Sequence, residues 1–232
     1  MKLHPHLTQA TFVRRLNRFA AEMIVDGQNV MVHIANSGRM EELLSAANRM
    51  LLTPVDPRSD RKTAFDLALV EVGGELVSAD ARLPNALLRE AIDAGRISEL
   101  TEYDEIRQEV TFEDSRFDLM LSGSLGSCYV EVKSVTLVED GIGLFPDAPT
   151  SRGRKHVQTL LSAVRQGYRG VALFVVQRSD AHAMSAHEIA DPDFCQTLRD
   201  AVSHGVEAYA YRCEVSINSI VIADAVPVLL NP

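Results

Sequence analysis

The chain has 232 residues, of which 46% are hydrophobic and 24% are charged, a balance that excludes a disordered chain and is typical of a soluble globular protein. The N-terminus lacks a long apolar core between its basic residues, which excludes a secretory signal, and no later stretch approaches the roughly 20 apolar residues of a membrane span. The net charge of −9 excludes a protein coated in Lys and Arg, although local patches rather than total charge govern contact with phosphates. We therefore expect a cytoplasmic protein that is not associated with a membrane.

Cysteine usage and the distribution of charge narrow the class of protein further. Cys128, Cys195 and Cys213 fit neither a disulfide framework nor a zinc cluster, so we expect reduced thiols. Residues 1–80 carry 9 basic and 10 acidic side chains, whereas residues 81–232 carry 14 basic and 22 acidic ones. The excess acid lies in the second part of the chain, and a cluster of carboxylates is what a divalent cation needs.

Residues 10–80 have the pattern of short strands and turns with little helix. Asp26-Gly27 favours a hairpin and Gly73-Gly74 marks a second one, while Met40–Leu44 is predicted to form a brief helical stretch. Several short strands in so few residues favour a small five-stranded barrel of the OB type. A half-open sheet is the alternative at this stage.

After residue 80 the pattern changes to alternating helices and strands. We predict helices at residues 86–94, 152–166 and 191–204, and strands at residues 105–112, 117–121, 128–138, 170–178 and within 206–230. The run at 170–178 is apolar throughout, as expected of a central strand buried on both faces. The fold class is therefore α/β (α+β overall), with an OB-like domain at residues 1–80 and a mixed sheet flanked by helices at residues 81–232.

Ionisable residues interrupt two of the predicted strands, where they are costly to bury unless they are paired or bound to a metal. Side chains alternate along a strand, so Glu131 and Lys133 share a face about 6.5 Å apart. Asp118 lies on the preceding strand and can come to lie beside Glu131. Mg²⁺ or Mn²⁺ held by one or two carboxylates would relieve their repulsion, and Lys133 could orient a metal-bound water or stabilise a phosphate. A solvated face with a weak ion pair is the alternative reading of a Glu-x-Lys pattern.

Several segments carry a resemblance to known proteins. Asp118 followed by Glu131-x-Lys133, with a helix on each side, resembles the restriction-endonuclease-like fold known as PD-(D/E)xK. The segments "VHIANSGRM", "RLPNALLREAI", "SRFDLML", "YVEVKSVTL", "FPDAPTSRGRKHV" and "VSINSI" occur in the order found in the sugar fermentation stimulation protein (SfsA) family. The similarity extends from about residue 12 to residue 224.

This resemblance implies an OB-like N-terminal domain, a nuclease-like C-terminal domain and DNA as the partner. It assigns Asp118, Glu131 and Lys133 to the nuclease motif, with Glu90 on the first helix as the natural candidate for a further acidic metal ligand. The alternatives are a catalytic, Mg²⁺-dependent phosphodiesterase and a non-catalytic DNA-binding regulator of sugar metabolism. The oligomeric state stays open, and a homodimer is compatible with the sequence.

Basic residues in two parts of the chain are candidates for contact with nucleic acid. Those near the start of the helix predicted after residue 150 could bind a phosphate, because a helix N-terminus attracts anions. Those of the predicted barrel could follow a nucleic-acid backbone, although a solvated basic face explains them equally well. The candidates are Arg14, Arg15, Arg18, Arg58, Arg61, Lys62, Arg152, Arg154, Lys155 and His156.

Overall fold

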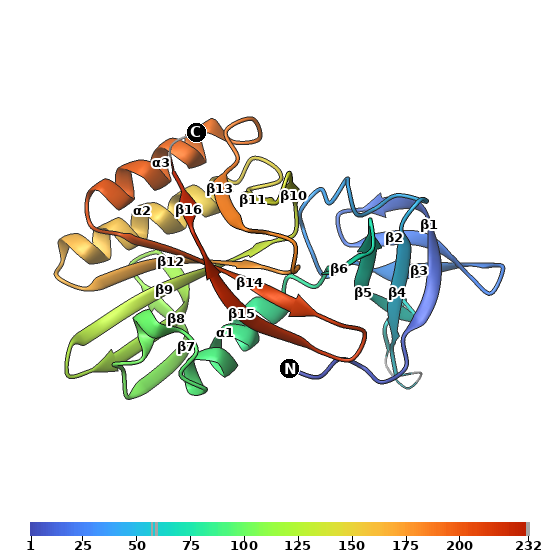
Figure 1. Ribbon diagram of the computed structural model, residues 1–232, viewed down its shortest axis with the longest axis horizontal. Coiled ribbons are helices and arrows are strands. Elements are labelled where there is room, and N and C mark those ends of the chain that lie inside the picture. The colour runs from blue at the N-terminus through green and yellow to red at the C-terminus, as the bar shows by residue number, and fades with distance from the viewer. Residues whose placement is uncertain (57, 59, 231–232) are drawn as a thin grey trace.

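The computed structural model describes residues 1–56, 58 and 60–230, which form two parts lying side by side (Figure 1). We call residues 8–78 the barrel and residues 81–230 the α/β region. The strands of the barrel are β1 (Thr8–Asn17), β2 (Ala20–Val25), β3 (Gln28–His33), β4 (Arg49–Pro54), β5 (Phe65–Val72) and β6 (Glu75–Ser78). None of the helices within the described residues is both long and apolar enough to cross a membrane.

The barrel closes on itself, as expected of an OB-like fold. Five strands close it, the predicted number, in the order β3-β2-β1-β4-β5, because a short parallel pairing between Val32 and Phe65 joins β3 to β5; β6 extends the sheet beyond β5. Alternate side chains point inward, and residues such as Met23 and Val32 are completely buried. The first hairpin turns at Asp26 and Gly27, whose φ angles of 49° and 78° match the type I′ turn that this dipeptide favours.

One local prediction for the barrel is wrong. Residues 41–44 form a turn and not a helix. Met40 has a φ of 53°, outside the helical range, and the side-chain amide of Asn48 donates to the carbonyls of Glu42 and Leu43 at 2.8 and 2.9 Å. Those carbonyls would accept backbone N–H groups if the helix continued, so a side chain from beyond the segment satisfies them instead.

The α/β region contains the predicted helices and strands in the predicted order. Its helices are α1 (Leu83–Asp93), α2 (Ser151–Arg165) and α3 (Pro192–Ser203), with a short 3-10 turn, η1, at Ser98–Leu100. Its strands are β7 (Glu105–Phe112), β8 (Ser115–Gly123), β9 (Gly126–Val135), β10 (Val138–Glu139), β11 (Ile142–Phe145), β12 (Arg169–Val176), β13 (Ala183–Ala186), β14 (Glu207–Val215), β15 (Ile220–Val226) and β16 (Val228–Leu229).

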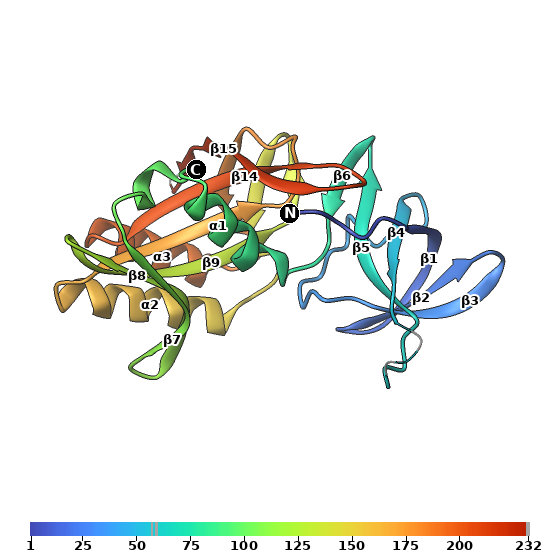
Figure 2. The same cartoon turned by 90° about the horizontal axis from the view of Figure 1, so that it is seen from below.

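The main sheet of the α/β region is mixed and covered on both faces. Its order is β15-β14-β12-β9-β8-β7, with β9, β12 and β14 parallel and the outer strands antiparallel to their neighbours. Helix α1 packs on one face through Leu88 and Ala91, while α2 and α3 pack on the other through Leu160 and Leu198 (Figure 2). The strands β10, β11, β13 and β16 form a smaller second sheet.

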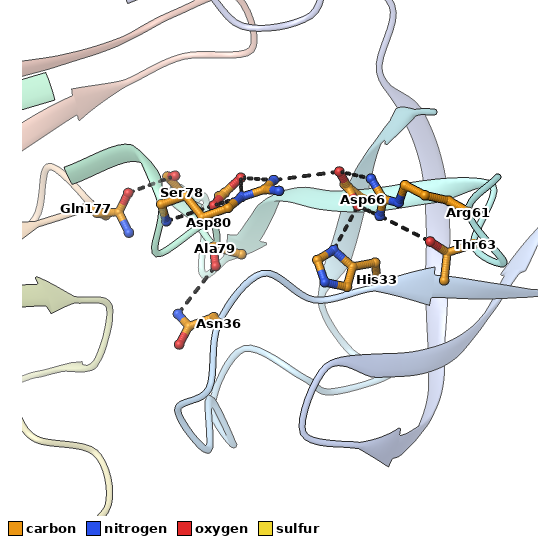
Figure 3. A network of polar contacts seen from close by, with 10 residues as sticks. His33, Asn36, Arg61, Thr63, Asp66, Ser78, Ala79, Asp80 and Gln177 are labelled. Atoms are coloured by element: carbon orange, nitrogen blue, oxygen red, sulfur yellow. Dashed lines mark hydrogen bonds and ion pairs between the residues drawn. The ribbon is translucent and has the colours of Figure 1, made fainter. Parts of the chain in front are cut away.

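The barrel and the α/β region meet through specific polar contacts. Ser78, at the end of β6, donates its backbone N–H and its hydroxyl to Gln177 at 3.0 and 3.1 Å, and both residues are completely buried (Figure 3). Asp147 of the α/β region accepts the backbone N–H of Met40 at 3.1 Å. Gly38 packs closely against Asp147. A Cβ atom at this position would lie 2.4 Å from Asp147 Oδ2, so a larger residue would not fit there.

Candidate functional site

The candidate site lies where strands β8 and β9 separate. Their pairing ends at Leu119 and Val130, so the next residues, Asp118 and Glu131, face each other at the open end of the ladder. The backbone N–H of Val132 has left the ladder there, and it donates to Asp118 Oδ2 at 2.8 Å. The carboxylate of Asp118 thus accepts an N–H of β9 in place of a carbonyl of β8, and the two strands no longer pair beyond this point.

Glu131 is the most enclosed of the predicted residues. Its side chain is 4% exposed, and its Oε1 atom accepts hydrogen bonds from Lys133 Nζ at 2.7 Å and from His156 Nδ1 on helix α2. Its other oxygen, Oε2, is buried without a hydrogen-bond partner in the described structure. Buried polar atoms are almost always satisfied, so a bare carboxylate oxygen in this position marks a site that can accept a cation.

The two carboxyl groups are held in different electrostatic environments. Burial raises the pKa of Asp118, and the charge of the neighbouring Glu131 raises it further. Burial also acts to raise the pKa of Glu131, but the hydrogen bond from His156 and the charge of Lys133 outweigh it, so the pKa of Glu131 is lowered. Glu131 is therefore ionised at neutral pH, and its charge makes ionisation of Asp118 costly unless a cation lies between them.

The chemistry of these donors fits a hard divalent cation. Mg²⁺ keeps several waters and commonly uses only one or two protein carboxylates, and Asp118 with the bare oxygen of Glu131 provides that number. Among the described residues, no three His, Cys, Asp or Glu side chains gather closely enough to hold a metal by themselves. The remaining ligands would therefore have to be waters, backbone carbonyls or substrate oxygens.

Glu90 does not join this group. Its carboxylate lies within 3.0 Å of the amino group of Met1 and 3.8 Å of Arg96, in an exposed position. Asn85, one and a half turns earlier on α1, reaches the site instead and donates its side-chain amide to Asp118 Oδ1 at 2.7 Å. The helix thus contributes a neutral residue that orients Asp118, and the expected acidic ligand from α1 is not found at the site.

The basic residues at the start of α2 have separate roles. Arg154 bonds to the buried Asp191 at 2.8 Å, and Asp191 also caps α3, so this ion pair joins the two helices. Lys155 pairs with Asp114 at 2.8 Å. Arg152 is exposed, and its Nε lies 3.4 Å from His156 Nε2, which places it next to the residue that bonds Glu131. The expected basic residues therefore do not form one patch. Arg152 lies beside the site, whereas Arg154 and Lys155 pair with acidic residues.

Three arginines of the barrel are also engaged within the fold. Arg14 pairs with Glu22 at 2.7 Å, and Arg58 pairs with Asp56. Arg15 turns inward and donates to backbone carbonyls of residues 36–39, including that of Gly38 at 2.7 Å. The first contact is a cross-strand pair between β1 and β2, the second joins residues two positions apart, and Arg15 holds the segment that follows β3.

The remaining basic candidates of the barrel lie at its surface. Arg61 bonds to Asp66, which also bonds to His33 at 3.0 Å (Figure 3). Arg18 and Lys62 are exposed, and the described structure gives their side chains no acidic partner. Within the part of the chain that the structure describes, Asp118 and Glu131 bond to residues of the α/β region and to none of the predicted barrel residues.

Sequence reasoning missed the roles of Asn85 and His156 in the site. His156 was grouped with the basic candidates for phosphate contact, but it is 6% exposed and bonds a carboxylate. A usable signal existed, because a histidine at the sixth position of an amphipathic helix, on its apolar face, must find a polar partner when buried. The sequence does not name that partner, since it comes from a strand 25 residues earlier.

The fold and site define an α/β protein with an N-terminal OB-like barrel followed by sheets flanked by helices. Comparison with known proteins agrees. Residues 13–79 match the family model described as the SfsA N-terminal OB domain, and residues 82–219 match the sugar fermentation stimulation protein RE domain. The chain belongs to the sugar fermentation stimulation protein family.

Relatives extend over almost the whole chain. The sugar fermentation stimulation protein homolog of Desulforamulus reducens is 43% identical, covering 97% of this chain and 94% of the relative. That of Citrifermentans bemidjiense is 46% identical, covering 99% and 100%. A solved structure of Pyrococcus furiosus SfsA, described as a complex with Ca²⁺, superposes with a TM-score of 0.89 at 27% identity and covers 99% of both chains.

Proposed function

We propose that this protein is a divalent-metal-dependent phosphodiesterase that acts on DNA in the cytoplasm. The observation that carries the proposal is the pair of carboxylates at the open end of β8 and β9, one of which keeps a buried oxygen without a partner. Lys133 lies beside them, bonded to Glu131 at 2.7 Å. Two acids that can hold a metal ion and an amine beside them are groups suited to metal-assisted hydrolysis of a phosphodiester.

Asp118 and Glu131 are the residues that would hold the metal, Mg²⁺ or Mn²⁺. A bound ion of this kind supplies charge neutralisation at the phosphate and an acidified water. The calcium complex of the Pyrococcus furiosus relative supports a cation in this family, since Ca²⁺ also prefers oxygen ligands. In this chain, Asn85 and the N–H of Val132 fix the orientation of Asp118. Lys133 would neutralise charge that develops on the phosphate.

DNA is the substrate that the surroundings favour. Arg152 lies at the N-terminus of α2, which has no acidic residue in its first turn and so favours an anion there. Strands of OB-like barrels bind oligonucleotides in other proteins, and the exposed Arg18 and Lys62 on this barrel can add contacts to phosphates. An acidic protein that binds DNA needs such local basic groups, because its overall charge repels the polymer.

A non-catalytic DNA-binding regulator of sugar metabolism is the second candidate. It is favoured by the position of Glu90, since the described residues offer no third acidic or histidine ligand at the site. In that case the nuclease-like sheet would act only as a platform for DNA.

The test is a cleavage assay on supercoiled, linear and single-stranded DNA with Mg²⁺, Mn²⁺ or a chelator. The variants are Glu131→Ala and Lys133→Ala, with Thr159→Val as a control, because Thr159 is also a buried polar residue but lies on α2 and bonds Ser115. Metal-dependent cleavage that is lost in both site variants and kept in the control supports the enzyme. Binding of DNA without cleavage under any of these metals selects the non-catalytic protein.

A further inference from the structure

His156 joins Arg152 to Glu131 in a line of contacts that leads from the protein surface into the candidate site. Arg152 is exposed and approaches Nε2 of the imidazole at 3.4 Å. The other ring nitrogen, Nδ1, bonds Glu131 Oε1. A carboxylate oxygen can only accept, so Nδ1 carries a proton and donates it to Glu131.

The position of the histidine on α2 leaves it little freedom. His156 is 6% exposed, and its neighbours Val157 and Leu160 are part of the core between α2 and the sheet. The helix itself is fixed at its start, where Thr150 Oγ1 accepts the N–H of Gly153 at 3.0 Å. The ring is therefore a rigid donor with a defined direction, and it does not adapt to the carboxylate.

The two oxygens of Glu131 are consequently unequal. Oε1 accepts from both His156 and Lys133, while Oε2 accepts from nothing in the described structure although it is buried. Two donors on one oxygen fix the orientation of the carboxylate, since rotation would break both bonds. The contact from α2, together with Lys133, thus sets the direction in which the other oxygen of Glu131 faces.

We infer that His156 is a positioning residue for the cation site: its Nδ1 proton fixes Glu131 so that Oε2 is presented to a divalent metal. The inference rests on the cation site of the proposed function and deepens it. Groups that orient a metal ligand in this way typically change metal affinity or activity by about 10–100-fold when removed. A purely structural histidine would affect only the stability of the fold.

The experiment measures Mn²⁺ affinity without DNA, by the electron paramagnetic resonance signal of the free ion, for the intact protein and two variants. His156→Asn keeps an amide donor where Nδ1 lies, and His156→Leu removes it. Thr159→Val is the control for loss of a buried polar group from the same helix. Urea unfolding of each variant reports its stability separately.

We expect the dissociation constant of His156→Leu to rise about 10–100-fold, with His156→Asn within about threefold of the intact protein. Thr159→Val should keep the original affinity even if its stability falls. If the leucine variant is unfolded by circular dichroism, His156→Met, an unbranched apolar side chain, replaces it with the same expectation.

Three results would overturn the inference. These are an intact protein that does not bind Mn²⁺, a leucine or methionine variant with unchanged affinity, and an asparagine variant as weak as the leucine one. The phosphodiesterase proposal fails differently, because a protein that binds Mn²⁺ in this pattern and cleaves no DNA would contradict the enzyme and leave the role of His156 standing.

Discussion

The surroundings of Asp66 in the barrel and of Glu131 in the α/β region are alike in composition and differ in one respect. Each carboxylate is mostly buried and bonds both a histidine and a longer basic side chain. Both oxygens of Asp66 are used, since Arg61 bonds to each of them and His33 bonds to Oδ1 (Figure 3). Glu131 uses one oxygen and keeps the other bare. The saturated carboxylate of Asp66 stabilises the fold of the barrel, whereas that of Glu131, next to Asp118, leaves one oxygen for a partner that the chain does not supply.

The largest expected effect is on catalysis. Glu131→Gln keeps the shape of the side chain and removes its charge, so it should lower the rate at saturating DNA about a thousandfold, the size of a metal's contribution of several kcal/mol. Asp66→Asn should leave that rate unchanged. Equal loss of cleavage in both variants would show that the two carboxylates do not differ in the way proposed.

The carboxylate of Asp66 should matter for the stability of the protein. Asp66→Asn leaves its basic partners without a counter-charge, and we expect the free energy of unfolding to fall by about 1–3 kcal/mol in urea. Arg14→Ala, which breaks the exposed pair with Glu22, is the control and should cost no more than about 1 kcal/mol. An Asp66 variant as stable as the intact protein would contradict this account of the barrel.

The dependence of stability on pH should separate the two carboxylates of the site. The pKa of Asp118 is raised in the folded state, so its contribution favours folding at low pH and is lost as the pH rises from about 4 through the folded pKa. Asp118→Asn keeps an acceptor for the N–H of Val132, and we expect it to be more stable than the intact protein at pH 7, with the gain vanishing near pH 4.

Glu131 should show the opposite sign. Its pKa is lowered, so its contribution is present above the ordinary glutamate range and is lost as the pH falls through the folded pKa. The stability of Glu131→Gln relative to the intact protein should therefore improve as the solution is acidified. Urea unfolding at a series of pH values checks both variants, and parallel curves for the two would refute the assignment.

The smallest expected effect concerns the arginines of α2, which differ in whether an acidic side chain already pairs with them. Arg152 has no acidic partner in the described structure, and Arg154 is bonded to Asp191. Arg152→Ala should reduce the slope of log affinity for DNA against log salt by about 1. Arg154→Ala should lower the melting temperature and leave the slope nearly unchanged. If only Arg154→Ala flattened the slope, the assignment of the phosphate contact would be wrong.

Much of this architecture could be predicted because local signals agreed with one another. The turns at Asp26-Gly27 and Gly73-Gly74 each have a local physical cause, and the structure contains both. The apolar run at residues 170–178 likewise indicated a central strand, and β12 is buried along almost its whole length.

The contacts within the site could be predicted only in part. The facing of Asp118 and Glu131 follows from adjacent antiparallel strands, which short connections favour. The choice of Asn85 over Glu90 depends on the rotation of α1 about its axis, which packing against β15 and β9 sets and no local pattern encodes. The helix predicted at residues 40–44 is wrong for a similar reason, because the hydrogen bond to the carbonyl of Glu42 comes from the side chain of Asn48.

The bonds from Ser78 through Gln177 have a practical consequence for dissecting the protein. Gln177 also donates its side-chain amide to Ser134 at 2.9 Å, directly after Lys133, so hydrogen bonds connect β6 of the barrel to β9, the strand that bears Glu131 and Lys133. Cutting the chain between the two parts would leave the buried side-chain amide of Gln177 without its partner Ser78, next to β9. A separated domain that shows no DNA binding or cleavage would therefore not show that the domain lacks these functions in the intact protein. Point substitutions in the full chain are the better way to assign functions to the barrel and to the α/β region.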